Sequence, residues 1–141
     1  MSVADSPVGW VNDHIRRYVE TDGAEGHEWR PGVHTLLLTT KGRKSGEPRR
    51  TALIYRRHGD AVVVVASSGG APKHPAWYLN LETNSEAEVQ VGPEKYQVRA
   101  RTAEGEERAE LWKSLNEVWP DYANYQTKTD REIPVVVLDR V

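Results

Sequence analysis

A run of four consecutive valines at positions 62–65 constrains the fold of this chain more than any other feature. β-Branched residues favour extended backbone, and an apolar run without polar alternation is typical of a strand covered on both faces. His58, Gly59 and Asp60 form a turn signal directly before the run. The pattern therefore predicts a buried strand over residues 61–66, entered from a tight turn.

Five further segments have strand patterns, and most connections between them are short enough for hairpins. Gly92, Pro93 and Glu94 form one such turn signal. Strands and helices do not alternate as a doubly wound parallel sheet requires, so we expect an antiparallel barrel of about six strands. The five further strands are predicted over residues 34–40, 51–57, 86–91, 95–101 and 133–138.

Helical periodicity predicts three or four helices that flank this barrel. Apolar residues follow one side over residues 8–20 and 105–118, and a short helix could follow Pro120. Pro75 suits the first turn of another helix, which continues over residues 76–81. Residues 21–32 are rich in turn formers and predict a loop, which could cover a site. At 141 residues, the chain is expected to be a single domain, 1–141.

The composition excludes several classes of site. The chain has no cysteine, which removes disulfides and thiolate chemistry and agrees with a reducing cytoplasm. Its five histidines lack the spacing of a ligand motif, so we expect no metal. No segment approaches the roughly 20 apolar residues of a membrane span, and no nucleophile elbow, dinucleotide fingerprint or P-loop occurs. The net charge of -2 argues against nucleic acid as a partner.

Basic residues are instead concentrated in the segment 41–51, between the first two predicted strands. Five of its eleven residues are cations, and Gly42 and Gly46 allow a tight turn. Guanidinium forks and backbone N–H groups in such a loop can bind phosphate or carboxylate. A solvated hairpin end has the same composition, so this segment alone leaves both interpretations open.

Two later segments have a similar ambiguity. Segment 67–80 contains serines, glycines and a helix start, where anions are attracted, but it could equally be a plain strand-to-helix connection. Trp119, Tyr122 and Tyr125 follow one another at three-residue steps. They could wall a cofactor or simply pack in the core.

Together the three segments resemble the deazaflavin (coenzyme F-420)-dependent nitroreductase and quinone reductase family of actinobacteria. The resemblance runs from His34 to Val137 and is carried by LLTTKGRKSGEPR at 37–49, VASSGGAPKHPAWYLNL at 65–81 and YANYQTKTDREIPVV at 122–136. It implies an α+β, mostly β fold, a split β-barrel like that of flavin reductases and FMN-binding proteins. It also implies hydride transfer from reduced coenzyme F-420 to a quinone-type or nitroaromatic acceptor, without a metal.

The resemblance also implies roles for particular residues. The coenzyme's phosphate and acidic tail would meet Arg43, Lys44 and Ser45, with Arg49 and Arg50 in the same stretch. The ring system would contact Thr51, Ala52, Leu53, Ile54, Val65, Ala66, Ser67, Ser68, Ala76, Trp77, Tyr78, Leu79, Asn80 and Tyr122. Ser67 and Tyr122 are the catalytic candidates, as hydrogen-bond donors to the acceptor. Trp119 and Tyr125 would lie at the substrate mouth.

The chain departs from the family pattern at several positions. Ser68 stands where the family often has lysine, and Lys73 or Arg50 could replace that charge. Trp119 stands where some members have tyrosine, which changes the substrate wall. Of the family's activities, nitroimidazole reduction is therefore the one that the resemblance supports least for this chain. Residues 1–33 match poorly and could help cover the substrate.

Three other functions remain open from the sequence: an FMN-binding oxidoreductase of the same barrel class, a non-catalytic deazaflavin carrier, and a basic-loop module for acidic partners. The net charge of -2 argues against the last. The acceptor could be menaquinone, another quinone, a nitroaromatic or an unsaturated lipid-like molecule. For menaquinone the cytoplasmic protein must approach a bilayer, and helix 8–20 could lie on its surface, although its apolar stripe favours a place in the core. The oligomeric state is not readable from the sequence.

Overall fold

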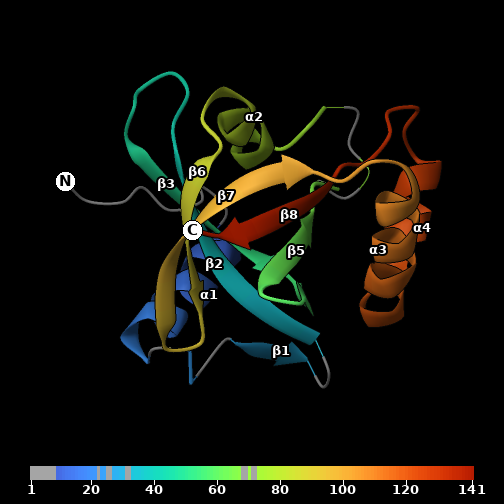
Figure 1. The fold of residues 1–141 in the computed structure, drawn as a ribbon. Coiled ribbons are helices and arrows are strands. Elements are labelled where there is room, and N and C mark those ends of the chain that lie inside the picture. Colours follow the sequence, from blue (N-terminus) through green and yellow to red (C-terminus); the bar gives the residue numbers. More distant parts are fainter. Residues whose placement is uncertain (1–8, 22, 25–26, 31–32, 68–69, 71–72) are drawn as a thin grey trace.

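The computed structural model describes residues 9–21, 23–24, 27–30, 33–67, 70 and 73–141, and these form a curled antiparallel sheet with flanking helices (Figure 1). The strands pair in the order β1-β2-β6-β7-β8-β5-β4, and β3 pairs with β2 off this path. The strands are β1 (Glu28–Arg30), β2 (Val33–Lys41), β3 (Pro48–Ile54), β4 (Arg56–His58), β5 (Ala61–Val65), β6 (Glu86–Val91), β7 (Glu94–Thr102) and β8 (Val135–Arg140). The helices are α1 (Gly9–Glu20), α2 (Ala76–Thr83), α3 (Gly105–Val118) and α4 (Asp121–Thr127).

The described part of the chain contains eight strands, against about six expected. The strand β1 lies inside the segment 21–32 that was predicted as a loop, and it is held by pairing with the start of β2. The predicted strand 51–57 is divided at Tyr55, whose N–H donates to the His34 carbonyl while the residues after it pair with β5. In both places the structure differs from the predicted strands because backbone pairing with residues distant in the sequence determines where a strand forms or ends.

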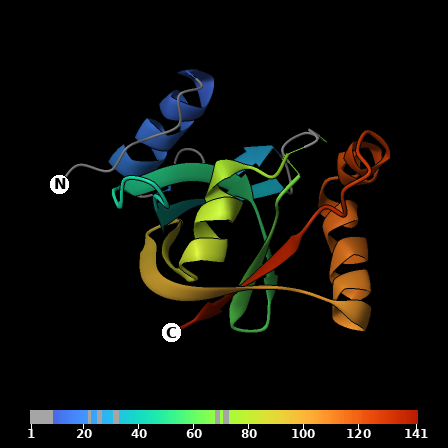
Figure 2. The ribbon, with the colours of Figure 1, turned by 90° about the horizontal axis from the view of Figure 1, so that it is seen from above.

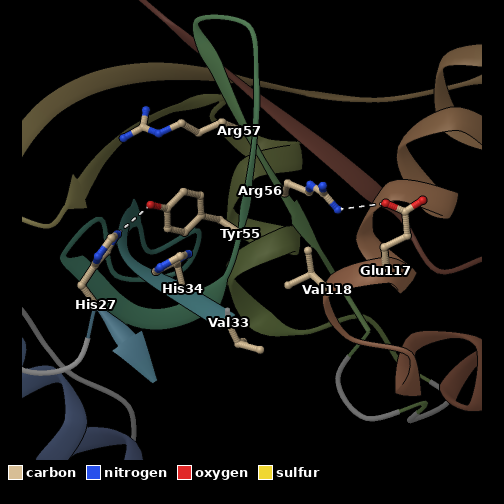
Figure 3. Close-up of a pocket in the computed structure, with 8 residues that line it drawn as sticks. All are labelled: His27, Val33, His34, Tyr55, Arg56, Arg57, Glu117 and Val118. Atoms are coloured by element: carbon tan, nitrogen blue, oxygen red, sulfur yellow. Dashed lines mark hydrogen bonds and ion pairs between the residues drawn. The ribbon is translucent and has the colours of Figure 1, made fainter. Parts of the chain in front are cut away.

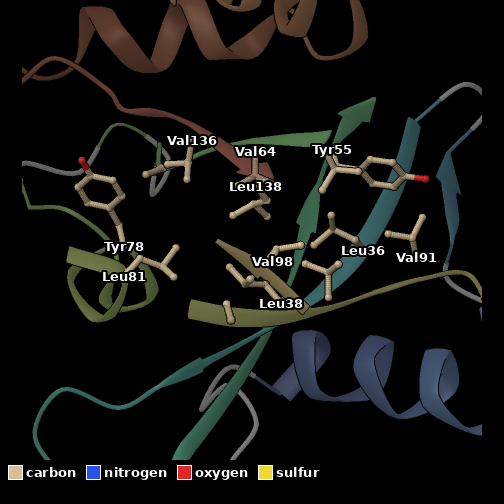
Figure 4. Close-up of a cluster of buried hydrophobic side chains, with 14 residues drawn as sticks. Leu36, Leu38, Tyr55, Val64, Tyr78, Leu81, Val91, Val98, Val136 and Leu138 are labelled. Atoms are coloured by element: carbon tan, nitrogen blue, oxygen red, sulfur yellow. The ribbon is translucent and has the colours of Figure 1, made fainter. Parts of the chain in front are cut away.

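The valine strand β5 is buried along its whole length, as predicted for a strand covered on both faces. Val62 and Val64 point into the barrel core shown in Figure 4, where Leu36 and Leu138 contact the same cluster. The alternate residues, such as Val63, belong to a second cluster under α3 and α4. Both faces of β5 are therefore covered, although β5 pairs with β8 on one side and with the edge strand β4 on the other.

Helix α1 packs its apolar stripe against the sheet. Ile15 and Tyr18 are fully buried and share a cluster with Leu37 of β2. Figure 2 shows α1 on one side of the molecule and the α3–α4 pair on the other, with α2 between them. Among the described residues, no helix is long and apolar enough to cross a membrane.

Candidate functional site

The basic loop between β2 and β3 is a compact turn that closes on itself. The Gly42 N–H donates to the Glu47 carbonyl, and the Gly46 N–H donates to the Gly42 carbonyl, both at 2.8 Å. A Cβ added at Gly42 would lie 2.9 Å from the Ser45 hydroxyl oxygen, and Gly46 has a φ of 74°. The positive φ favours glycine at position 46, whereas at position 42 an added Cβ would crowd the Ser45 side chain and the Glu47 carbonyl oxygen.

The cations of this loop are mostly exposed. Among the described residues, no carboxylate pairs with Arg43 or Lys44, whereas Arg49 lies 3.9 Å from the Glu47 carboxylate. Arg49 and Arg50 are consecutive on β3 and so project from opposite faces of the strand. The structure thus brings Arg43 and Lys44 together as unneutralised charges, but it separates Arg49 from Arg50.

The four predicted ring contacts on β3 are likewise divided between two faces. Ala52 packs beneath α1, and Leu53 packs against the barrel core. Thr51 and Ile54 are half-buried at the two ends of this stretch. A flat ring on one face of β3 could contact only the alternate residues.

Asn80 on α2 connects the basic loop to the second segment. Its side chain is buried, and its Oδ1 accepts hydrogen bonds from the Arg43 backbone N–H at 3.2 Å and from Arg43 Nη1 at 3.1 Å. Its Nδ2 donates to the Thr40 hydroxyl at 3.0 Å. One amide group therefore fixes both the end of β2 and the first cation of the loop.

The other predicted residues of α2 differ widely in exposure. Ala76 is exposed, and Leu79 is half-buried. Trp77 is partly buried against the barrel core, and Tyr78 is inside it, with its hydroxyl 2.8 Å from that of Thr102. For Tyr78, core packing is a sufficient explanation. Pro75, which was predicted in the first turn of this helix, is its N-cap residue, and the helix begins at Ala76.

Arg131 connects the end of β5 to the third segment. Its Nη1 donates to the Ala66 carbonyl at 3.2 Å and lies 3.1 Å from His74 Nδ1, and its Nη2 donates to the Ser67 carbonyl at 2.7 Å. Val65 and Ala66 are buried, and Ser67 is half-buried. Ser68, the last predicted contact of this stretch, lies outside the described residues.

Two aromatic residues of the third segment, Tyr122 and Tyr125, lie on helix α4, and Trp119 lies just before it. Tyr122 is 5 % exposed, and its ring contacts those of Trp112 and Tyr125. Burial, with a smaller contribution from Tyr125, raises the pKa of the Tyr122 phenol, so it remains protonated at neutral pH. Trp119 and Tyr125 are half-buried, and the Trp119 indole N–H donates to the Tyr125 hydroxyl at 3.3 Å. Tyr122 can therefore act as a donor but not as a base.

Two cavities lie at opposite ends of β3. The first, of about 770 Å³, opens beside the basic loop and is lined by Lys41, Gly42, Arg43, Gly46, Thr83, Asn84, Ser85, Glu86 and Arg99. The second, of about 680 Å³, is drawn in Figure 3 and is lined by His27, Val33, His34, Tyr55, Arg56, Arg57, Glu117 and Val118. Among the described residues, no group of histidine and acidic side chains could hold a metal ion.

None of the residues lining the second cavity was predicted from the sequence as a site residue. Tyr55 is 6 % exposed, and its hydroxyl lies 2.7 Å from His27 Nε2. The rings of His27 and His34 are stacked at 4.9 Å. No local pattern signals this cluster, because Tyr55 and His27 are 28 residues apart, with Tyr55 between β3 and β4 and His27 directly before β1.

Burial shifts the pKa values of this pair in opposite directions. Desolvation lowers the pKa of His27, and His34 and Arg57 lower it further. Desolvation raises the pKa of the Tyr55 phenol, which a hydrogen bond and the charge of Arg57 partly oppose. Both groups are therefore neutral at pH 7, beside a guanidinium that could stabilise a phenolate.

Comparisons with known proteins give a consistent result. A family model described as F420H(2)-dependent quinone reductase matches residues 10–140. An F420H(2)-dependent quinone reductase of Mycobacterium tuberculosis is 44% identical over 130 residues, which cover 90% of this chain and 87% of that protein.

Two solved structures resemble most of the chain. A structure described as an F420-H2 dependent reductase (FDR-A) is 45% identical with a TM-score of 0.69, covering 74% of this chain and 93% of that one. A chain described as a domain-swapped dimer is 43% identical with a TM-score of 0.73, covering 95% of this chain and 100% of that one. These likenesses identify the curled sheet as a split β-barrel, as expected.

Proposed function

The chain belongs to the F420H(2)-dependent quinone reductase family, and on that basis we propose that it transfers a hydride from reduced coenzyme F-420 to a quinone-type acceptor. The observation that carries this proposal is the joining of the three family segments in space. Asn80 holds the basic loop to α2, and Arg131 holds the end of β5 to the segment after α4. Family membership favours this function over an FMN-binding oxidoreductase and over a non-catalytic carrier.

The unneutralised cations of the basic loop fit the anionic part of the coenzyme. Coenzyme F-420 has a flat deazaflavin at one end and a phosphate with a glutamate tail at the other. Arg43, Lys44 and the Ser45 hydroxyl would hold the phosphate and the first carboxylates, since charge-assisted hydrogen bonds to such groups are about twice as strong as neutral ones. The bound coenzyme supplies the hydride, and the protein supplies position and electrostatics.

The ring and the acceptor would lie between β3 and α4. Ser67 or Tyr122 would donate a hydrogen bond to the acceptor oxygen, where negative charge develops, and such a donor contributes roughly 10²–10³ in rate when preorganised. Trp119 and Tyr125 would form the acceptor's wall. A nitroaromatic acceptor would use the same wall, and a membrane quinone would require the protein to approach a bilayer.

A double substitution tests the coenzyme site. Arg43→Ala with Lys44→Ala should weaken coenzyme binding steeply, and more for long glutamate tails than for short ones. Lys95→Ala with Lys113→Ala is the matched control, because both lysines are exposed and lie outside the loop. Coenzyme affinity is measured by fluorescence titration. If the affinity changed neither with the loop substitutions nor with the tail length, the assignment of this loop as the coenzyme's anion site would be wrong.

Two further measurements separate the alternatives. Titration with FMN and with coenzyme F-420 compares the coenzymes directly, and a clear preference for FMN would overturn the proposal. Menadione reduction with reduced coenzyme distinguishes an enzyme from a carrier, which would bind without turnover.

Tyr122→Phe should lower turnover more than coenzyme affinity, and unchanged turnover would remove Tyr122 from the mechanism.

A further inference from the structure

The cavity in Figure 3 continues both walls of the proposed ring site. Strand β3 ends at Ile54 and Tyr55 follows, while α3 ends at Val118 and Trp119 follows. Tyr55 and Val118 both line the cavity. Arg56 connects the two sides, because its Nη1 donates to the Ser114 carbonyl on α3 at 2.8 Å. The cavity thus lies where the β3 wall and the α3–α4 wall meet.

Its distance from the basic loop suits a long coenzyme. Strand β3 has seven residues. At about 3.3 Å per residue, its two ends are roughly 20 Å apart. If coenzyme F-420 is held at the loop by its anionic end and lies along β3, its deazaflavin ring comes toward the cavity. The acceptor must contact that ring to receive the hydride.

The cavity presents a rigid hydroxyl group. The Tyr55 ring belongs to the barrel core, as Figure 4 shows, so the position of its hydroxyl is fixed by packing. Figure 3 shows Tyr55, His27 and Arg57 on one side of the cavity, and Arg56 with Glu117 on the other. Among the described residues, no carboxylate pairs with Arg57, and the positive charge of Arg57 opposes the rise in the pKa of the Tyr55 phenol.

We propose that this cavity receives the second oxygen of the quinone-type acceptor, the one that lies away from Ser67 and Tyr122, and that Tyr55 donates the proton that completes its reduction. The inference rests on the proposed function. In the tautomer required, His27 Nε2 carries a proton and donates it in a hydrogen bond to the Tyr55 oxygen, which leaves the phenolic proton free to point at the acceptor.

The reaction balances with one hydride and one proton. A quinone that takes a hydride, with its electron pair, becomes a hydroquinone monoanion. The Tyr55 O–H bond then breaks, and the proton forms the second hydroquinone O–H bond. The resulting phenolate is stabilised by the hydrogen bond from His27 and by the Arg57 guanidinium, and it takes a new proton from water.

The substitution Tyr55→Phe tests the proton transfer, because it keeps the ring in the core and removes only the hydroxyl. Tyr96→Phe is the matched control, since Tyr96 is half-buried on β7 beneath Arg140 and outside the cavity. Loss of a general acid typically costs 10²–10⁴-fold in rate, so we expect kcat for menadione to fall about 10²-fold with unchanged coenzyme affinity. The control should retain wild-type kcat.

A second measurement needs no coenzyme. The histidine ring signals of the coenzyme-free protein are followed by NMR while menadione is added. The signals of His27 and His34 should shift, while those of His58, the exposed last residue of β4, should not. This measurement tests the cavity as an acceptor site independently of turnover. If the wild-type protein did not turn over with reduced coenzyme F-420, the proposed function would be refuted, but the shifts of the histidine signals would still support the cavity as an acceptor site.

Two outcomes would overturn the inference. One is a Tyr55→Phe protein that turns over like the Tyr96→Phe control. The other is a set of histidine signals that responds to inorganic phosphate and ignores menadione, which would make the cavity an anion site. Thermal unfolding of both variants checks that the fold is kept, and His27→Gln, which leaves the Tyr55 ring in place, should also lower kcat.

Discussion

Replacing Asn80 with alanine should release the basic loop from α2. The Asn80 side chain makes three hydrogen bonds, one to the buried Thr40 hydroxyl and two to Arg43. A typical hydrogen bond contributes about 1 kcal/mol net, and a buried group left unpaired costs about 1–3 kcal/mol. Thr40 is 2 % exposed and would be left without this partner, whereas Arg43 is exposed and would regain water. We therefore expect the free energy of unfolding to fall by about 2–3 kcal/mol.

Urea unfolding measures this loss, and Asn84→Ala is the matched control. The Asn84 side chain accepts a single hydrogen bond, from the exposed Glu86 N–H at 3.1 Å, so its removal should cost at most about 1 kcal/mol. In the same proteins, coenzyme affinity should fall more for Asn80→Ala than for Asn84→Ala, because both residues are near the loop but only the loss of Asn80 lets Arg43 move. An Asn80→Ala protein as stable as its control, with unchanged coenzyme affinity, would refute the reasoning.

Three further predictions concern parts of the fold that support the site. Tyr18→Phe should lower the free energy of unfolding by about 2–3 kcal/mol in urea, because the buried hydroxyl that accepts the Gly92 N–H at 2.6 Å is lost; a loss no larger than that of Tyr96→Phe would contradict this. Gly70→Ala should lower the melting temperature more than Gly59→Ala. Both glycines have positive φ, but only at Gly70 would an added Cβ meet the Tyr125 carbonyl oxygen, at 2.6 Å. Equal melting temperatures for the two variants would contradict this prediction. Finally, burial lowers the pKa of His14 and of His27, so the unfolded chain takes up protons at higher pH than the folded chain. The free energy of unfolding should therefore fall as pH drops below about 6.5, and His27→Gln should flatten this dependence in urea titrations at different pH values.

Much of the fold could be predicted from the sequence because its signals are local. The segment 86–91 was predicted as a strand from its alternating pattern, and β6 has those bounds. The helix over 105–118 was predicted from its apolar side, and α3 has those bounds. In both segments the periodicity of buried residues agrees with the backbone that forms.

The last strand shows where local signals become insufficient. It was predicted over residues 133–138, but β8 runs from Val135 to Arg140. Its charged end is not apolar enough to be recognised, yet Arg140 pairs with Val98 of β7. A partner strand can extend pairing beyond the apolar run.

The amino-acid sequence by itself determined the barrel class, the buried valine strand, the glycine-dependent basic loop and the family, since each depends on neighbouring residues or on motif order. Only the tertiary structure decided which of those residues meet. The bonds from Asn80 to Arg43 and from Arg131 to Ser67 join positions 37 and 64 residues apart, and the Tyr55–His27 pair forms only because β3, β2 and the segment before β1 converge. Such pairings depend on how strands are ordered in the sheet, and no local pattern of residue types encodes that order.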